Sequence, residues 1–186
     1  QAWQRFFVSG NLPTRHGNSY DAIAPYDSFK AKDGYVVIGC GNQKLFEIFC
    51  KELLQRPELI EDGRFLNVPL RVKNNKEFKV YVEEWLSGVN VDEAVKLVLS
   101  KGIPAGPILD LRQISEDEHF CNYRKVFTEV NHPVAGTIKL NSNPIHLSET
   151  KVEIQGPSPS LGQHNEEVLL GLGYSEEDIS YFSEKG

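Results

Sequence analysis

The sequence contains no methionine, and it has only three cysteines among its 186 residues. Cys40, Cys50 and Cys121 form no Cys-X-X-Cys pair and are odd in number. We therefore interpret them as reduced thiols that serve as small apolar side chains, as in a cytoplasmic protein. No stretch reaches the ~18 consecutive apolar residues that predict a membrane-spanning helix. The N-terminal QAWQRFF also lacks the basic region and apolar core of a signal peptide. Because the sequence opens inside a helical pattern without an initiating methionine, we expect the protein to extend before Gln1.

Several chemical signatures are missing as well. The sequence contains no HExxH, no DxDxDG calcium loop, no Walker phosphate loop and no GxSxG nucleophile motif. Four histidines are scattered without metal-ligand spacing: His119, His132, His146 and His164. We therefore expect no metal site. A net charge of −6, from 20 basic and 26 acidic residues, argues against a nucleic-acid partner or an anionic membrane surface.

Apolar spacing predicts helices and short strands without a regular βαβ alternation. Helical spacing is found at residues 1–8, 45–54, 76–86 and 91–99, and two short helices are expected around 166–170 and 176–182. Two antiparallel hairpins are predicted, from strands 26–29 and 35–38 and from strands 127–130 and 137–140. IPAGPI, residues 103–108, is expected to be a rigid loop. This mixture predicts an α+β fold rather than a doubly wound parallel sheet. The linker QGPSPS near residue 157 suggests that the last ~30 residues pack elsewhere.

The loop GCGNQ, residues 39–43, is the most promising local site. It follows the strand-like run YVVI and precedes a helix for which Asn42 is a plausible N-cap. Glycine permits positive φ and close approach of a ligand, and backbone N–H groups at a helix start favour anions or a developing oxyanion. The same residues also fit an ordinary strand-to-helix turn, so this pattern alone leaves both interpretations open.

Arg15 and His16 lie in a second polar segment, RHGN, beside a predicted turn. An arginine can hold a phosphate or carboxylate as a fork, and a histidine can act as an acid or base. Both residues fit a solvent-exposed loop equally well. We retain them as weak substrate-binding candidates.

An ordered series of motifs resembles the C-terminal half of family III CoA-transferases, the group that includes formyl-CoA, carnitine and succinyl-CoA:glutarate transferases. The series runs from residue 1 to about 182 and comprises GNLPTRHGN, IAPYDSF, KDGYVVIGCGNQKLF, RPELIEDGRF, LRVKNN, EEWL, GIPAGPI, EVNHPVAGTIKLNSNPIHLS and PSLGQHNEEVLLGLGYS. Two positions depart from the usual family pattern. Tyr20-Asp21 stands where the family often has His-Pro, and Asp62-Gly63-Arg64-Phe65 where it often has Asp-Pro-Arg-Phe.

The resemblance implies a two-domain subunit in an interlocked homodimer. Residues 1–24 would then be a helix and linker from a Rossmann-like large domain, and residues 25–150 a small α+β domain. Residues 151–186 would be a tail that returns to the large domain or to the partner subunit.

The resemblance also implies a mechanism in which an aspartate carboxylate attacks an acyl-CoA and then carries CoA to a carboxylic acid. That aspartate would lie in the missing N-terminal half, so we expect no catalytic residue in this chain and little activity from it alone. CoA and acyl-CoA would be substrates, with no covalently bound cofactor. A mobile active-site glycine loop closes over the carboxylate in such enzymes, and its counterparts here would be Gly39, Cys40, Gly41, Asn42 and Gln43.

Two alternatives remain. The chain could be a stand-alone dimerisation or CoA-binding module without catalysis, because apolar surface left by an absent domain favours association. It could also be a fragment of an enzyme like α-methylacyl-CoA racemase, whose acid–base residues would again lie outside this chain.

Overall fold

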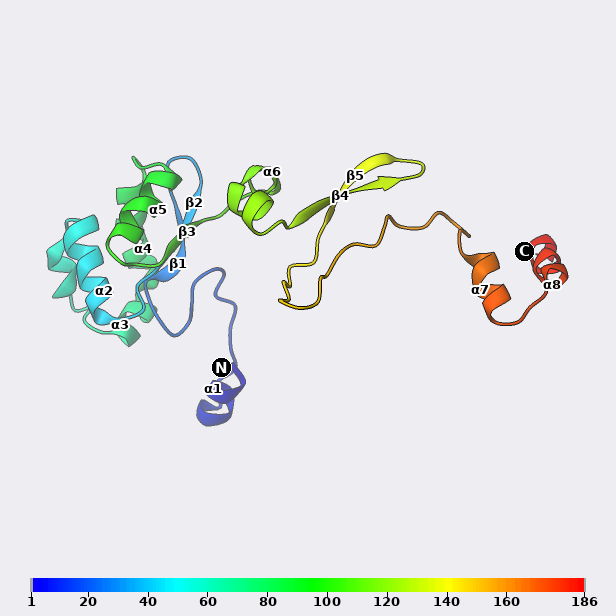
Figure 1. Cartoon of the computed structure of the whole chain (residues 1–186). Helices are drawn as coiled ribbons and strands as arrows, with labels where there is room; N and C mark the ends of the chain where they lie inside the picture. The colour runs from blue at the N-terminus through cyan, green and yellow to red at the C-terminus, as the bar shows by residue number, and fades with distance from the viewer. Residues whose placement is uncertain (1, 186) are drawn as a thin grey trace. The chain divides into compact units, whose positions relative to one another are not determined.

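A computed structural model describes residues 2–185, and its contacts divide the chain into two compact units. Unit 1 comprises Gln1–Leu109 and unit 2 comprises Asp110–Gly186. Helices and short antiparallel strands occur in both units (Figure 1), which confirms the predicted α+β class. Among the described residues, no helix is both long and apolar enough to cross a membrane.

A three-stranded antiparallel sheet organises unit 1, in the order β1-β2-β3. Strand β1 (Tyr26–Lys30) and strand β2 (Tyr35–Gly39) form the predicted hairpin, in which Tyr26 pairs with Gly39 and Lys30 with Tyr35. The expectation of a loop at IPAGPI was wrong, since Ala105–Pro107 forms the edge strand β3 beside β2. A proline is tolerated there because an edge strand need not donate every ladder hydrogen bond.

The side chains on the two faces of this sheet differ in solvent exposure. Phe29, Val36 and Ile38 point to the helical side and are fully buried. Tyr26, Tyr35 and Val37, on the other face, are 44%, 49% and 37% exposed. Strand alternation places the two sets on opposite sides. Segment 18–20 of unit 1 covers part of this second face, because Asn18 donates a hydrogen bond to the buried Ser28 and the ring of Tyr20 packs on Tyr26. We call the second face the open face, since Tyr26, Tyr35 and Val37 still expose apolar surface there.

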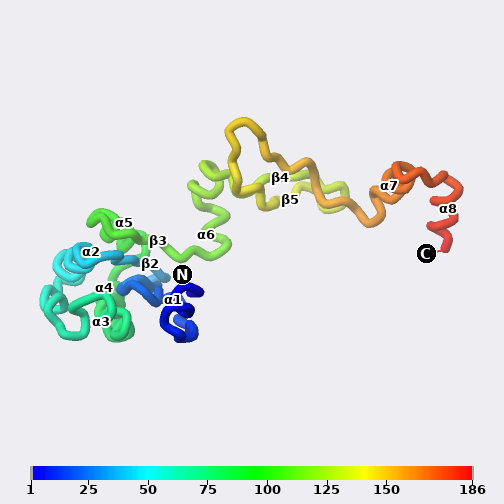
Figure 2. Tube along the Cα trace, turned by 90° about the horizontal axis from the view of Figure 1, so that it is seen from below, coloured from blue at the N-terminus to red at the C-terminus, as the bar shows by residue number. Residues whose placement is uncertain are grey.

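Helices cover one side of the sheet (Figures 1 and 2). They are α2 (Gln43–Ile48), which continues into the π-helical turn η1 (Phe49–Leu53), the 3₁₀ turn η2 (Pro57–Ile60), α3 (Val68–Lys73), α4 (Asn75–Leu86) and α5 (Val91–Ser100). Helix α4 packs on β1, and α5 packs on β2 and β3. Between these layers lies one apolar core rich in phenylalanine, including Phe46, Phe49, Phe65 and Phe78.

Local sequence explains where these helices begin and end. The side chain of Asn42 accepts a hydrogen bond from the backbone N–H of Leu45 at 3.0 Å, as expected of an N-cap. Gly102, at φ 71°, follows α5 in the left-handed conformation that glycine commonly adopts after a helix C-terminus. The predicted helices at 76–86 and 91–99 are confirmed as α4 and α5.

The first helix, α1 (Ala2–Ser9), has no fully buried residue. It ends at Gly10, whose φ is 71° and whose N–H donates to the carbonyl of Phe6. The predicted helix included Gln1, which lies outside the described residues. The segment from Gly10 to Pro25 then reaches β1 without regular structure.

Unit 2 consists of small elements in sequence. These are α6 (Leu111–Glu116), the π-helical turn η3 (His119–Tyr123), the hairpin of β4 (Phe127–His132) and β5 (Gly136–Asn141), α7 (Asn165–Gly171) and α8 (Glu176–Lys185). Residues 142–164 lie between β5 and α7 and have only turns and bends (Figure 2). The predicted hairpin and both tail helices are confirmed. The prediction that the tail packs on a large domain or partner subunit stays a prediction.

Candidate functional site

The loop Gly39–Gln43 joins the end of β2 to the start of α2. Its first part is held by backbone hydrogen bonds, from Gly39 N–H to the carbonyl of Pro104 at 3.0 Å and from Cys40 N–H to that of Pro25 at 2.8 Å. Gly39 and Cys40 are buried, whereas the next three residues, 41–43, are exposed. The loop therefore combines a fixed base with an accessible tip.

Its two glycines have different roles. A Cβ on Gly39 would lie 2.8 Å from the ring of Tyr26, its cross-strand partner, so a larger residue would displace that ring. A Cβ on Gly41 would meet nothing within 4 Å. Neither glycine has a positive φ. The requirement at Gly39 is therefore close approach of an aromatic ring rather than an unusual backbone conformation.

The tip presents backbone donors. Within the described residues, no hydrogen bond is made by the N–H groups of Gly41, Asn42 and Gln43. The carbonyl and side-chain oxygens of Asn42 meanwhile accept from Phe46 and Leu45 in the first turn of α2. Such N–H groups can bind a carboxylate or a developing oxyanion.

A buried arginine, Arg71 of α3, lies against the end of this loop. Its Nη1 donates to Oε1 of Gln43 at 2.8 Å and to the carbonyl of Phe65 at 2.9 Å, and its Nε donates to the carbonyl of Ala24 at 3.0 Å. Burial lowers the pKa of its guanidinium. The family resemblance included LRVKNN but did not identify Arg71. Its position seven residues before the core residue Phe78 was the available signal for an inward direction.

The thiol of Cys40 in the loop is poorly suited to act as a nucleophile, because the thiolate is the reactive form. Burial, together with the nearby Cys50, raises the pKa of its thiol to about 12. Burial likewise raises the pKa of Cys50 to about 12. Both thiols therefore remain protonated at neutral pH, which fits the predicted role as small apolar side chains.

Arg15 and His16 lie in the segment between α1 and β1. Both are exposed. His16 Nε2 lies 3.5 Å from Oδ2 of Asp21, a carboxylate that also pairs with Arg5. His16 and Asp21 line a groove of about 500 Å³ beside α1. No hydrogen bond or ion pair joins Arg15 or His16 to the glycine loop within residues 2–185, so they stay weak candidates.

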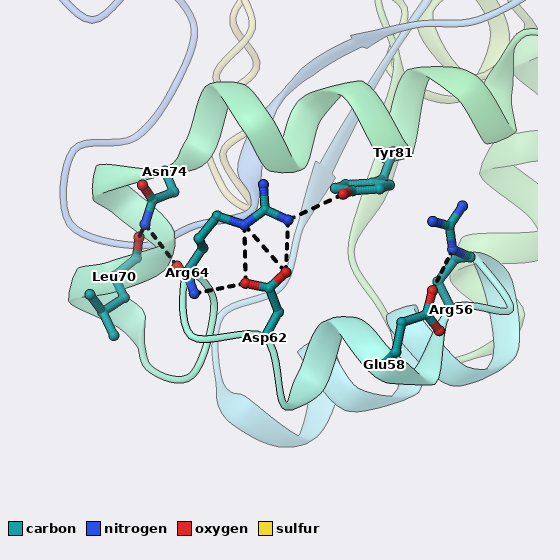
Figure 3. A network of polar contacts seen from close by, with 7 residues as sticks. All are labelled: Arg56, Glu58, Asp62, Arg64, Leu70, Asn74 and Tyr81. Atoms are coloured by element: carbon teal, nitrogen blue, oxygen red, sulfur yellow. Dashed lines mark hydrogen bonds and ion pairs between the residues drawn. The ribbon is translucent and has the colours of Figure 1, made fainter.

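The motif Asp62-Gly63-Arg64-Phe65 forms a polar network beside α4 (Figure 3). The Arg64 guanidinium donates to both carboxylate oxygens of Asp62, the shortest contact being 2.7 Å, and to the hydroxyl of Tyr81 at 3.2 Å. Hydrogen bonds from the side chain and backbone of Arg64 lower the pKa of Asp62 to about 2. Phe65 follows directly, buried in the core, with its carbonyl on Arg71. The motif thus helps to position the carbonyl of Phe65, which accepts a hydrogen bond from Arg71.

Among the described residues, no group of three or more His, Cys, Asp or Glu side chains could hold a metal ion. The groups found at the loop are the backbone donors of residues 41–43, the carboxamide of Gln43 and the buried guanidinium of Arg71.

Comparison with known proteins places this arrangement in a family. A sequence model of CoA-transferase family III matches residues 1–165. Succinyl-CoA:glutarate CoA-transferase of Mus musculus is 36% identical over 169 residues, which cover 91% of this chain and 38% of that protein. Formyl-CoA:oxalate CoA-transferase of Streptomyces coelicolor is 38% identical over 137 residues, which cover 73% of this chain and 33% of that protein.

A solved structure shows the same architecture. The crystal structure of a CAIB/BAIF family protein from Brucella suis matches with a TM-score of 0.74 at 28% identity. The matched region covers 92% of this chain and 43% of the Brucella suis chain. The chain therefore spans about two fifths of the length of the proteins it matches.

Proposed function

The chain belongs to CoA-transferase family III, and from this premise we propose that it is the C-terminal part of an enzyme that moves CoA from an acyl-CoA to a carboxylic acid. Gly39–Gln43 would be the loop that covers the reacting carboxylate. The observation that carries this assignment is the accessible tip, residues 41–43, on a base fixed to Pro25 and Pro104.

The loop would act by excluding water and by donating hydrogen bonds. A mixed anhydride and an enzyme-bound thioester are both open to hydrolysis, so a cover over the site protects the transfer. The N–H groups of Gly41, Asn42 and Gln43 can stabilise the negative charge that develops on a carbonyl oxygen.

The carboxylate nucleophile is assigned to the part of the subunit outside this chain. Asp27 and Asp62, two acids of unit 1, already have cationic neighbours, Lys79 at 3.5 Å and Arg64 at 2.7 Å. These contacts suit structural ion pairs. We further propose that the complete subunit forms a homodimer and works in the cytoplasm.

Complementation tests the proposal. The 186-residue chain is combined with the part of the protein that precedes it, and CoA transfer from succinyl-CoA to a panel of dicarboxylic acids is followed by separation of the thioesters. We expect transfer by the combined parts and almost none by the chain alone. Transfer by the chain alone at the combined rate would refute the division of the active site.

A matched pair of glycine variants tests the loop itself. Gly41 and Gly88 both have open space where a Cβ would lie, and neither has a positive φ. Gly41→Val should lower transfer about tenfold by stiffening the tip, whereas Gly88→Val should leave it unchanged. Equal transfer activity of the two variants would contradict a role of the loop in CoA transfer.

A non-catalytic association module is the second candidate, and the open sheet face favours it. Tyr26, Tyr35 and Val37 expose apolar surface that a partner would cover. Light scattering combined with CoA titration separates the two functions. Dimers of this chain that do not bind CoA, together with failed complementation, would favour the module.

A further inference from the structure

We propose that Arg71 is a positioning residue for the glycine loop: its buried guanidinium fixes Gln43, and thereby the orientation of the exposed tip. This role rests on the proposed function of the loop, although the geometry can be tested without any enzymatic assay.

The guanidinium joins three segments that are distant in sequence. Arg71 is 1% exposed, and it donates to the carbonyls of Ala24 and Phe65 and to the side chain of Gln43. Its Cζ also lies 4.2 Å from the centroid of the Phe46 ring. A planar group with donors in a fixed fork holds such partners in one relative geometry.

Both ends of the glycine loop are connected by hydrogen bonds to Arg71 or to the backbone segment that Arg71 binds. At the first end, the N–H of Cys40 donates to the carbonyl of Pro25. At the second end, Gln43 binds Arg71, which itself binds the carbonyl of Ala24, the neighbour of Pro25. The backbone at residues 24–25 therefore ties both ends together, and only Gly41 and Asn42 lie between the anchored residues.

The charge of Arg71 makes a purely structural role costly. Among the ion pairs within residues 2–185, none includes Arg71, and its hydrogen-bond partners in this range are two backbone carbonyls and a carboxamide. Removing a cation from water without a carboxylate is unfavourable, and an apolar side chain of similar size often stabilises such a position. An apolar residue would supply neither the hydrogen bonds to the carbonyls of Ala24 and Phe65 nor the directed contact to Gln43, and only the last of these reaches the glycine loop.

Gln43 transmits this contact to the tip. It is the first residue of α2, and its Nε2 also donates to Oε1 of Glu47 at 3.1 Å. Its side chain is thus held on both polar atoms, which limits rotation of the helix start. The preceding residue is Asn42, whose oxygens cap that same turn through Leu45 and Phe46.

Amide hydrogen exchange on the 186-residue chain gives the direct test. The N–H groups of Leu45 and Phe46 report whether Asn42 is in place, and that of Cys40 reports the other end. Gln43→Met removes the acceptor but keeps the length. We expect the protection of Leu45 and Phe46, relative to Cys40, to fall about tenfold, the effect of losing one charge-assisted hydrogen bond.

Conservative and distant variants complete this test. Gln43→Glu keeps an acceptor for Arg71 but loses the donor to Glu47, so it separates the two contacts of this side chain. If the contact to Arg71 is the one that places the tip, Gln43→Glu should retain the ratio of protection. Gln4→Met, at an exposed glutamine of helix α1, should also leave it unchanged. Arg71→Met should reproduce the loss, and Arg71→Lys should not restore it because an ammonium cannot form the fork. A ratio is used because global destabilisation lowers both protections together. For Arg71→Met the reference is the N–H of Ala94, which donates to the carbonyl of Asn90, because Arg71 also holds Ala24 beside the acceptor of the Cys40 N–H. An unchanged ratio in Gln43→Met and Arg71→Met would overturn the proposal.

The complemented enzyme gives a second readout. Gln43→Met should raise the ratio of thioester hydrolysis to CoA transfer about tenfold, because a misplaced tip admits water. A merely structural contact would leave that ratio unchanged. If the combined wild-type parts transfer no CoA at all, the proposed function fails. The amide hydrogen exchange of the Arg71 and Gln43 variants still tests the positioning role, because it does not depend on enzymatic activity.

Discussion

Residues 2–109 and residues 110–185 bury their apolar side chains to very different extents. All of the buried core residues lie in unit 1, between Ala24 and Ile103. Every described residue of unit 2 is at least partly exposed, and Leu111 and Val134 are 86% and 83% exposed. Yet unit 2 forms several helices, of which α6 has a capping box, and a regular hairpin. Regular secondary structure can therefore form in this chain without a hydrophobic core. We expect another protein surface to cover the exposed apolar side chains of unit 2.

Core truncation should give the largest difference between the units. The ring of Phe78, 1% exposed, lies within 5.2 to 6.4 Å of the centroids of Phe46, Phe49 and Phe65. Phe78→Ala should lower the free energy of unfolding by about 3–5 kcal/mol. In unit 2, Val134→Ala should change it by less than about 0.5 kcal/mol. Urea unfolding measures both, and similar losses would contradict the comparison.

Alkaline pH should destabilise unit 1 next most strongly. The ordinary pKa of Cys40 and Cys50 is 9.0, and burial raises both to about 12. Between these values the unfolded chain releases protons that the native state keeps, so stability falls as pH rises from 9 towards 12. We expect a loss of about 3 kcal/mol at pH 10 from the two thiols.

A double variant and a thiol-reactivity experiment isolate this pH effect. Replacing both residues with alanine should flatten the dependence of unfolding free energy on pH, even if packing is somewhat weaker at pH 7. Cys121 in unit 2, which is partly exposed, should react with a thiol reagent in the native state before Cys40 and Cys50 do. Equal reaction rates of the three thiols would argue against tight burial of the loop base.

Helix caps allow the same chemistry to be compared in both units. Asn42→Ala should cost about 1 kcal/mol of unfolding free energy, because α2 belongs to the packed core. Asp110 caps α6 through a capping box with Gln113. Asp110→Ala should reduce local helicity without shifting the main transition. A shift as large as that of Asn42→Ala would show that α6 unfolds with the core.

The smallest effect is expected from removing unit 2 altogether. A chain that ends at Leu109 keeps every residue of the core cluster. Its unfolding free energy should match that of the full chain within about 0.5 kcal/mol, as for surface changes away from special features. Loss of a cooperative transition would instead show that unit 2 contributes to the stability of unit 1.

Much of the fold was predictable because it depends on local patterns. The helix after Asn42, the helices of 76–86 and 91–99 and both hairpins follow apolar spacing and turn residues. Strand β3 was missed because a three-residue strand that ends in a proline has no readable period, and its pairing is provided by β2. The close approach of Tyr26 that requires Gly39 was missed for the same reason, since it occurs across two strands.

The sequence by itself determined the order of elements, the α+β class and, through its series of motifs, the family. The tertiary structure alone decided that Gly39 and Cys40 are buried while residues 41–43 are exposed, and that Arg71 joins Ala24, Phe65 and Gln43. The reason is physical: spacing along the chain governs which face of a helix or strand is apolar. Burial and the partners of a charge depend instead on contacts between segments far apart in sequence, which form only when the chain folds.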